Sequence, residues 1–345
     1  MMNKRALYSV AIAVLSAAVL AACAKAAGAP QQRQEGTAKS AGKAATVVTI
    51  GIQGKTGILN YARDKKLFET AFAKAGADVV WSEFQSGPPH FEAIASGRID
   101  FGSVGGTPVI SGQVGGVDFK AIAVTDDGKR GNMIVVPKNS PIASLKDLKG
   151  KKVGVAKGSS AYNFLYMAIN RAGLKGEDVN VIQLQPDEAR PALDSGAIDA
   201  WSIWEPYATT AVFQTGAKIL VTGADLNINA PSFLVARTKF TQEHPDLTVL
   251  FLKTYEQARA YYASHLDEVT DQFVATQKLD RQIVSEVLKK SAPILSPITP
   301  DFAKAHQEQA DFLYGVHAIN KKLDVSKVLD SKYVEQALKE LKENK

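Results

Sequence analysis

Short β-branched runs alternate with helical stretches along the first part of the folded chain. The run at 47–52 has the character of a buried strand, and a polar, glycine-rich turn follows it. Apolar residues at helical spacing come next, and Ala75-Gly76 ends them as a C-cap would. The predicted order is strand 47–52, turn 53–57, helix 59–75, strand 78–84, turn 85–89, helix 91–96, strand 99–104 and turn 105–108.

The same order recurs in a second stretch of the chain. Residues 95–100 (ASGRID) and 194–199 (DSGAID) match in register, since Ser-Gly ends a helix in both and an Ile and an Asp follow. Agreement of element order and turn chemistry indicates two similar halves. The second half is predicted as strand 152–156, turn 157–160, helix 164–171, strand 179–184 and a helix through Leu193.

Alternating strands and helices predict an α/β fold with parallel sheets and right-handed crossovers. The extended apolar segments 135–137 and 233–236 are interpreted as two crossings, which would form a two-segment hinge. The helical pattern at 242–342 is expected to pack against a lobe without contributing to the site. We therefore predict a lobe 1 of residues 46–134 and 234–345 and an inserted lobe 2 of residues 135–233.

The N-terminus has the pattern of an export signal. Lys4 and Arg5 precede an apolar run at 6–20 that is too short for a comfortable membrane span. The run ends in Leu-Ala-Ala-Cys23, which resembles a bacterial lipobox. We expect a signal peptide at 1–22, lipid on Cys23, a flexible tether at 23–45 and an exported protein anchored to a bacterial membrane.

Composition narrows the possible functions. The chain has 345 residues, of which 46% are hydrophobic and 22% charged, as in a soluble protein of two domains. The net charge of +6 is mild, and the lysines at 146–152 lack interleaved aromatics, so we expect no nucleic acid partner. Cys23 is the single cysteine and the histidines have no paired spacing. We expect no metal, no cofactor and a monomer.

The turns after the strands are candidates for binding an anion. Ligands of such sheets bind beyond the carboxyl ends of the strands, where helices begin and offer unpaired N–H groups. Hydroxyl side chains there would add donors, although each of them could simply cap its helix. The candidate ligand-binding residues are Lys55, Thr56, Gly57, Ser86, Gly106, Thr107, Ser159, Ser160, Trp204 and Glu205.

Two of these candidates have alternative interpretations. Trp204 could form a wall beside the ligand or pack between the lobes. Glu205 could face the cleft, and the ligand would then need a cationic end, as in an aminosulfonate. Alternatively, Glu205 lies beside Pro206 at a helix start and complements the helix dipole. The ligand is therefore predicted to be a small anionic or zwitterionic organic molecule.

Two other patterns are set aside. Residues 51–56 suggest a phosphate-binding loop, but Thr49 stands where its first glycine is required, so nucleotide hydrolysis is not expected. Asp126-Asp127 is followed at once by Gly128-Lys129-Arg130, which we interpret as an exposed charged turn.

Together these motifs resemble the aliphatic sulfonate, taurine and nitrate group of ABC-transporter substrate-binding proteins. The resemblance implies a type II periplasmic-binding-protein fold, discontinuous lobes that close about a hinge, and a sulfonate held by amides and hydroxyls of the turns. It also implies delivery of the solute to a membrane permease, and no enzymatic activity. The likeness is carried by the Gly51 turn, 95–102 (ASGRIDFG), 105–108 (GGTP), 145–153 (LKDLKGKKV), 157–160 (KGSS), 204–207 (WEPY), 310–312 (ADF) and 333–334 (YV).

The chain departs from that group at two positions. Gly106 stands where many sulfonate binders have Asp, and Glu205 replaces the Asp of the Trp-Asp-Pro-Tyr motif. Nitrate and a pyrimidine or thiamine precursor are alternative ligands. Trp201, Trp204 and Phe84 could stack on the ring of such a precursor. A desulfinase-type enzyme shares the fold but needs a nucleophilic cysteine, whereas the single cysteine here belongs to the expected lipid anchor.

Overall fold

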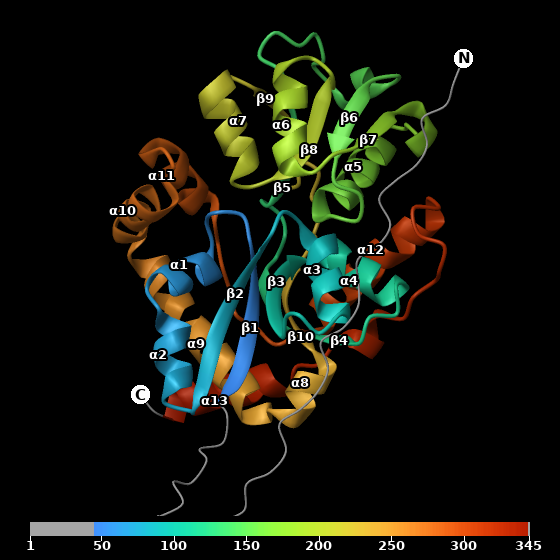
Figure 1. Cartoon of the computed structure of the whole chain (residues 1–345). Coiled ribbons are helices and arrows are strands. Elements are labelled where there is room, and N and C mark those ends of the chain that lie inside the picture. The colour runs from blue at the N-terminus through green and yellow to red at the C-terminus, as the bar shows by residue number, and fades with distance from the viewer. Residues whose placement is uncertain (1–44, 344–345) are drawn as a thin grey trace, which may run out of the picture. The chain divides into compact units, whose positions relative to one another are not determined.

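The computed structural model describes residues 45–343. The predicted signal peptide, Cys23 and nearly all of the tether lie outside the described residues. Two five-stranded sheets, called sheet A and sheet B, form the framework of the rest (Figure 1). Sheet A has the order β2-β1-β3-β10-β4 and sheet B the order β7-β6-β8-β5-β9. The strands are β1 (Thr46–Gln53), β2 (Ala77–Phe84), β3 (Phe101–Gly105), β4 (Phe119–Asp126), β5 (Asn132–Val136), β6 (Lys152–Val155), β7 (Asn180–Gln183), β8 (Ala200–Trp204), β9 (Lys218–Thr222) and β10 (Ser232–Arg237).

The two sheets share one topology, with one difference from the prediction of parallel sheets. In sheet A, β1 runs parallel to β2 and β3, but β10 is antiparallel to β3 and β4. In sheet B, β5 is the corresponding strand, antiparallel to β8 and β9. β5 and β10 are the strands that follow a change of sheet, so each enters from the other sheet and runs opposite to its neighbours.

The chain crosses between the sheets a few residues before the predicted positions. The first crossing is 127–131, between β4 and β5, and the second is 223–231, between β9 and β10. Val135 and Phe233 instead lie inside strands and are fully buried, because β-branched and aromatic residues are better accommodated in a sheet. The crossings touch each other, since a Cβ on Gly128 would overlap the Ala230 carbonyl.

The internal repeat has the same structural role in both halves. Gly97 and Gly196 end their helices with φ of 70° and 75°, in the left-handed region. The aspartate that follows each then accepts a hydrogen bond from the backbone of the first strand of its half. Asp100 Oδ2 accepts from Thr49 N at 2.9 Å, and Asp199 Oδ2 accepts from Lys152 N at 2.8 Å.

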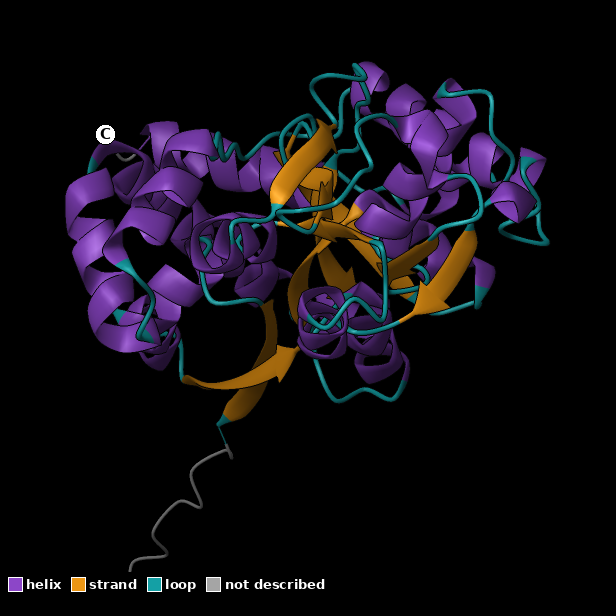
Figure 2. Cartoon of the chain, turned by 90° about the horizontal axis from the view of Figure 1, so that it is seen from above, coloured by secondary structure: helices purple, strands orange, loops and turns teal. Residues whose placement is uncertain are grey.

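Helices cover both faces of the sheets, as the view from above shows (Figure 2). The predicted helix at 59–75 is broken at Lys66, whose φ is 54°, and the break lets Phe68 and Phe72 stay fully buried. No helix in the described residues is long and apolar enough to cross a membrane. The helices are α1 (Ile58–Asp64), α2 (Leu67–Ala73), α3 (Gly87–Ala95), α4 (Gly106–Val114), α5 (Ser160–Arg171), α6 (Pro186–Asp194), α7 (Tyr207–Thr215), α8 (Thr238–Glu243), α9 (Pro245–Ser264), α10 (Leu266–Gln277), α11 (Arg281–Lys290), α12 (Pro300–Gly315) and α13 (Lys332–Glu343), with 3₁₀ turns at Leu145–Leu148, Gly176–Asp178 and Val325–Val328.

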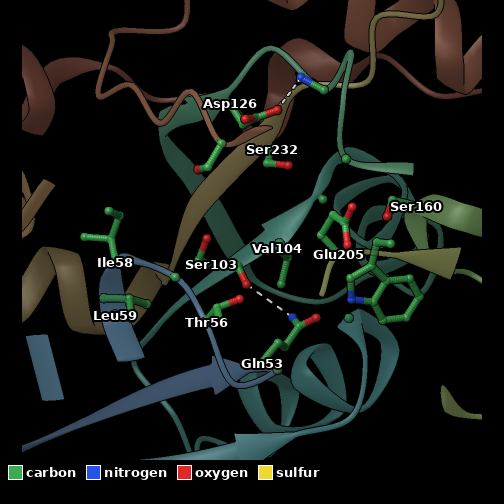
Figure 3. A pocket seen from close by; sticks show the side chains of 18 of the residues that line it. Gln53, Thr56, Ile58, Leu59, Ser103, Val104, Asp126, Ser160, Glu205 and Ser232 are labelled. Atoms are coloured by element: carbon green, nitrogen blue, oxygen red, sulfur yellow. Dashed lines mark hydrogen bonds between the residues drawn. The ribbon is translucent and has the colours of Figure 1, made fainter. Parts of the chain in front are cut away.

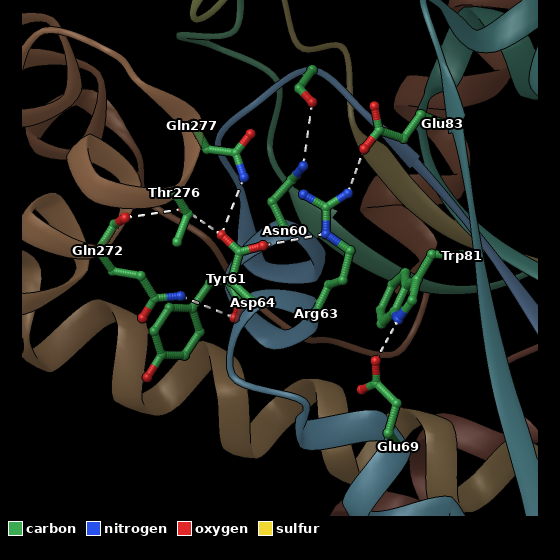
Figure 4. A network of polar contacts seen from close by, with 11 residues as sticks. Asn60, Tyr61, Arg63, Asp64, Glu69, Trp81, Glu83, Gln272, Thr276 and Gln277 are labelled. Atoms are coloured by element: carbon green, nitrogen blue, oxygen red, sulfur yellow. Dashed lines mark hydrogen bonds and ion pairs between the residues drawn. The ribbon is translucent and has the colours of Figure 1, made fainter.

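A polar network fixes α1 and the turn before it (Figure 4). Asp64 accepts hydrogen bonds from Thr276 Oγ1 at 2.6 Å and from Gln277 Nε2 at 3.1 Å, which ties α1 to α10. Asn60 Nδ2 donates to the Gly54 carbonyl at 3.2 Å. The C-terminal helices therefore hold the turn at 53–57, which follows β1 and forms part of the cavity described below.

The repeat aspartates should differ in their contribution to stability. Asp100 is 5% exposed and also pairs with Arg237 Nη2 at 2.5 Å. Asp100→Ala therefore leaves the Thr49 N–H and the Arg237 guanidinium without this acceptor. We expect a loss of about 2–4 kcal/mol of unfolding free energy, against about 1 kcal/mol for Asp199→Ala. Urea unfolding measures both, with exposed Asp118→Ala as the control. Equal losses for the two repeat variants would contradict this ranking.

Candidate ligand-binding site

A cavity of about 300 Å³ lies where strand ends of the two sheets meet (Figure 3). Sheet A contributes Gln53 from the end of β1 and Ser103 from β3. Ser160 at the start of α5 and Glu205 just after β8 line it from the side of sheet B. The cavity therefore occupies the position predicted from the strand-to-helix turns, at a size suited to a small molecule.

Helices α1, α3, α4 and α5 each begin at a residue that lines the cavity or adjoins one that does. Ser159 caps α5, and its Oγ accepts from Tyr162 N at 3.3 Å. Neither α3 nor α4 has a capping hydrogen bond from a side chain; Ser86 precedes α3 and Gly105 precedes α4. Ser86 Oγ is buried without a hydrogen-bond partner. First-turn N–H groups carry partial positive charge, so this edge of the cavity favours an anion.

The candidate residues divide into those that line the cavity and those that lie behind it. Lys55 is exposed on its turn and does not line the cavity. Ser86, Gly106 and Thr107 are buried, and Gly106 faces the Pro231 carbonyl and the side chains of α12. Those that line the cavity are Thr56, Gly57, Ser159, Ser160, Trp204 and Glu205.

Glu205 combines features of both interpretations. Its carboxylate accepts hydrogen bonds from the backbone N–H of Thr209 at 3.1 Å and from the Thr209 hydroxyl at 2.8 Å, both in the first turn of α7. It also lies 3.7 Å from the Nζ of Lys290 at the end of α11. Glu205 therefore lines the cavity, but its charge is compensated by the helix start and by a lysine.

Aromatic stacking on a ring ligand has little support from the geometry. Trp201 is only 1% exposed and belongs to the core of sheet B, so the expectation that it could stack on a ligand is wrong. Phe84 does not line the cavity and packs against His90 with ring centroids 4.8 Å apart. Of the three aromatic candidates, Trp204 alone borders the cavity, and its ring meets Tyr207 edge-on at 5.9 Å.

Asp126 and Arg130 line the cavity. The turn is exposed at Asp127, Lys129 and Arg130, as the sequence pattern predicts, but Asp126 is partly buried. Asp126 ends β4, and one of its carboxylate oxygens accepts from Gly128 N at 2.6 Å. Burial raises the pKa of Asp126 to about 6; the Gly128 N–H and Arg130 oppose the rise, and Asp127 adds to it. The position at a strand end was the available signal, but the charged neighbours obscured it.

The C-terminal helices also contribute to the cavity, contrary to the prediction. Tyr255 and Tyr262 of α9 line it, as do Lys290 and Ser291 at the end of α11. Helical periodicity gave no sign of this, because the positions that face a cavity and the positions that face a core follow the same spacing. Arg130 and Lys290 thus provide two cationic side chains in the wall.

No group of His, Cys, Asp or Glu suited to a metal ion occurs among residues 45–343. The two fully buried histidines, His90 and His306, both have pKa values lowered to about 3, chiefly by burial.

The sequence matches the model of a described protein family. Residues 31–275 match the NMT1-like family. A protein of Bacillus subtilis named for binding aliphatic sulfonates is 46% identical over 293 residues, which cover 85% of this chain and 88% of that protein.

Two solved structures have similar folds. The alkanesulfonate-binding protein SsuA from Xanthomonas axonopodis, bound to MOPS, superposes with a TM-score of 0.78 and 26% identity, covering 82% of this chain and 98% of that one. The periplasmic aliphatic sulphonate binding protein SsuA from Escherichia coli superposes with a TM-score of 0.72 and 32% identity, covering 82% and 91%.

The raised pKa of Asp126 predicts a pH-dependent contribution to stability. Between about pH 4 and pH 6 the folded protein keeps a proton that the unfolded chain, with an Asp pKa of 3.8, has released. The contribution is therefore present at low pH and lost as pH rises through 6. Asp126→Asn should raise the free energy of unfolding at pH 7 and match wild type near pH 4.

Urea unfolding across this pH range measures the difference between wild type and Asp126→Asn. Asp127→Asn is the matched control, because its side chain is half exposed in the same turn. A difference that stays constant from pH 4 to pH 7 would contradict the burial of an ionisable Asp126.

Proposed function

Since the chain belongs to the NMT1-like family, we propose that it is the solute-binding component of an ABC importer for aliphatic sulfonates. The relatives described above are named as binding proteins for aliphatic sulfonates or alkanesulfonates. Their ligands and systems imply a small organic anion and a membrane permease as the partners of this chain.

The observation that carries the proposal is the meeting of helix starts and cationic side chains at one small cavity. A sulfonate has three oxygens that accept hydrogen bonds and one negative charge. The Ser159 hydroxyl and the first-turn N–H groups of α5 supply donors, and Thr56 supplies a hydroxyl from the opposite sheet. Arg130, which is exposed and interacts electrostatically with Asp126, supplies positive charge at the cavity.

Ligand capture would couple to movement of the two lobes. The cavity is lined from both sheets, so a bound anion would bridge them and favour the closed arrangement. The division into two lobes remains a proposal. The segments that would bend are the crossings at 127–131 and 223–231, a few residues before the predicted boundaries at 134 and 233. The closed form would be the one that the permease receives.

The alternative ligands fit less well. A pyrimidine or thiamine precursor would need an aromatic cage, and Trp204 is the one remaining wall from the predicted set. Nitrate would occupy only part of a cavity of about 300 Å³. A desulfinase-type reaction needs a nucleophilic cysteine, and no cysteine occurs among residues 45–343.

The export route has two levels of support. The Escherichia coli structure is that of a periplasmic protein, which implies export of this chain. The lipid anchor is part of our proposal and depends on Cys23, which follows the small residues Ala21 and Ala22. Acylation there would hold the folded body at a membrane through the tether.

Sulfonate binding should depend on the hydroxyl donors. We expect wild type to bind a simple alkanesulfonate with roughly micromolar affinity, about −8 kcal/mol. Ser159→Ala or Thr56→Val should weaken binding about tenfold, because each removes a hydrogen bond to a charged group. Titration calorimetry measures the affinities.

The matched control is Thr299→Ala, which also removes a helix cap, at the start of α12 and outside the cavity. It should lower stability by a similar amount without changing affinity. If neither Ser159→Ala nor Thr56→Val changes the affinity, the assignment of the cavity is wrong.

Membrane association should depend on the single cysteine. Cys23→Ser removes the acceptor of the lipid, so the protein should appear in the soluble fraction of the exporting cell. Fractionation and mass spectrometry of the mature N-terminus measure the outcome. A variant that stays with the membrane, or a wild type without lipid, would contradict the anchor.

A further inference from the structure

Gln53 has an amide whose orientation the surrounding atoms determine. Its Nε2 lies 3.2 Å from the Ser103 carbonyl and 3.2 Å from His90 Nδ1. A carbonyl oxygen can only accept, so the amide nitrogen, and not the oxygen, must face Ser103. The opposite orientation would bring two acceptors together.

This orientation also fixes the state of His90. The amide nitrogen of Gln53 donates to both neighbours, so Nδ1 of His90 carries a lone pair and the ring proton lies on Nε2, a buried atom without a hydrogen-bond partner in the described part of the chain. His90 belongs to α3, and its ring is fully buried. The ring packs so closely against Gly102 that a Cβ on this glycine would overlap it. The lowered pKa of His90, about 3, agrees with a neutral ring.

With both amide hydrogens engaged, Gln53 turns its Oε1 toward the cavity (Figure 3). In the described part of the chain, Oε1 accepts no hydrogen bond. A sulfonate has only acceptor oxygens and cannot satisfy it. The partner of Oε1 must be a donor on another part of the ligand or a water molecule.

We propose that Gln53, held by His90, is a selectivity residue that favours sulfonates with an O–H or N–H donor on the carbon chain. The inference rests on the proposed function, because it assumes that the sulfonate lies at the helix starts. Gln53 then recognises the other end of a small ligand, and His90 acts as a positioning residue that does not touch it.

The test compares 2-hydroxyethanesulfonate with 1-propanesulfonate, which differ by a hydroxyl in place of a methyl group. Wild type should bind the hydroxy ligand about fivefold more tightly by calorimetry, the size expected of one neutral hydrogen bond. Gln53→Leu should abolish or reverse the preference. Ser159→Ala is the matched control and should weaken both ligands equally.

His90 is tested by a pair of variants and by a measurement on wild type. His90→Leu should reduce the preference, whereas His90→Asn should keep it, because an Asn oxygen can take the place of Nδ1. Since a buried substitution can prevent folding, ¹⁵N shifts of the wild-type imidazole provide an independent measurement. They should show a neutral ring with its proton on Nε2 from pH 5 to pH 8.

The contrary outcomes are distinct. Equal binding of the two ligands by wild type, or a preference that survives Gln53→Leu, would overturn the inference and leave the proposed function intact. A His90 ring that is charged or protonated on Nδ1 would also overturn it. Binding of neither ligand by wild type would overturn the proposed function, and the inference with it.

Discussion

The first-turn N–H groups of α3, α4 and α5 are the constraint around which the site is arranged. They have no partners inside their own helices and require an acceptor from a side chain, water or a ligand. Parallel strands bring such helix starts to one edge of a sheet, and here two sheets direct their edges at one cavity. Ser159 caps α5, but α3 and α4 lack side-chain caps, so part of this requirement is left to whatever occupies the cavity.

Much of the framework could be predicted because it depends on local signals. The β-branched runs give the strands, and Gly97 and Gly196 mark the helix ends as predicted. The antiparallel β5 and β10 could not be foreseen, because strand direction depends on where the chain enters from the other sheet. The break at Lys66 likewise follows from the burial of Phe68 and Phe72, which spacing alone does not reveal.

Site residues on the turns after strands could be predicted from the sequence. Residues whose position depends on burial, or on a helix far away in the sequence, could not. Thr56 and Ser159 line the cavity because the turns that follow β1 and β6 reach the edge where the two sheets meet. Thr107, in the first turn of α4, does not line the cavity and is only 2% exposed. Asp126 was obscured by its charged neighbours, and Lys290 comes from a helix with no local sign of a binding role. The pairing of Lys290 with Glu205 explains how a carboxylate can border a cavity suited to anions.

Gln53 shows that the position of a side chain in the site and the group it presents to the ligand are determined by different parts of the chain. Any polar residue at the end of β1 would border the cavity, and the sequence pattern is enough to place it there. Whether it presents a donor or an acceptor depends on Ser103 and His90, which are 50 and 37 residues away. His90 in turn fits only because Gly51 and Gly102 have no side chains. A substitution at any of these buried positions could therefore change which sulfonate is preferred without touching the ligand or the helix starts that hold its charge.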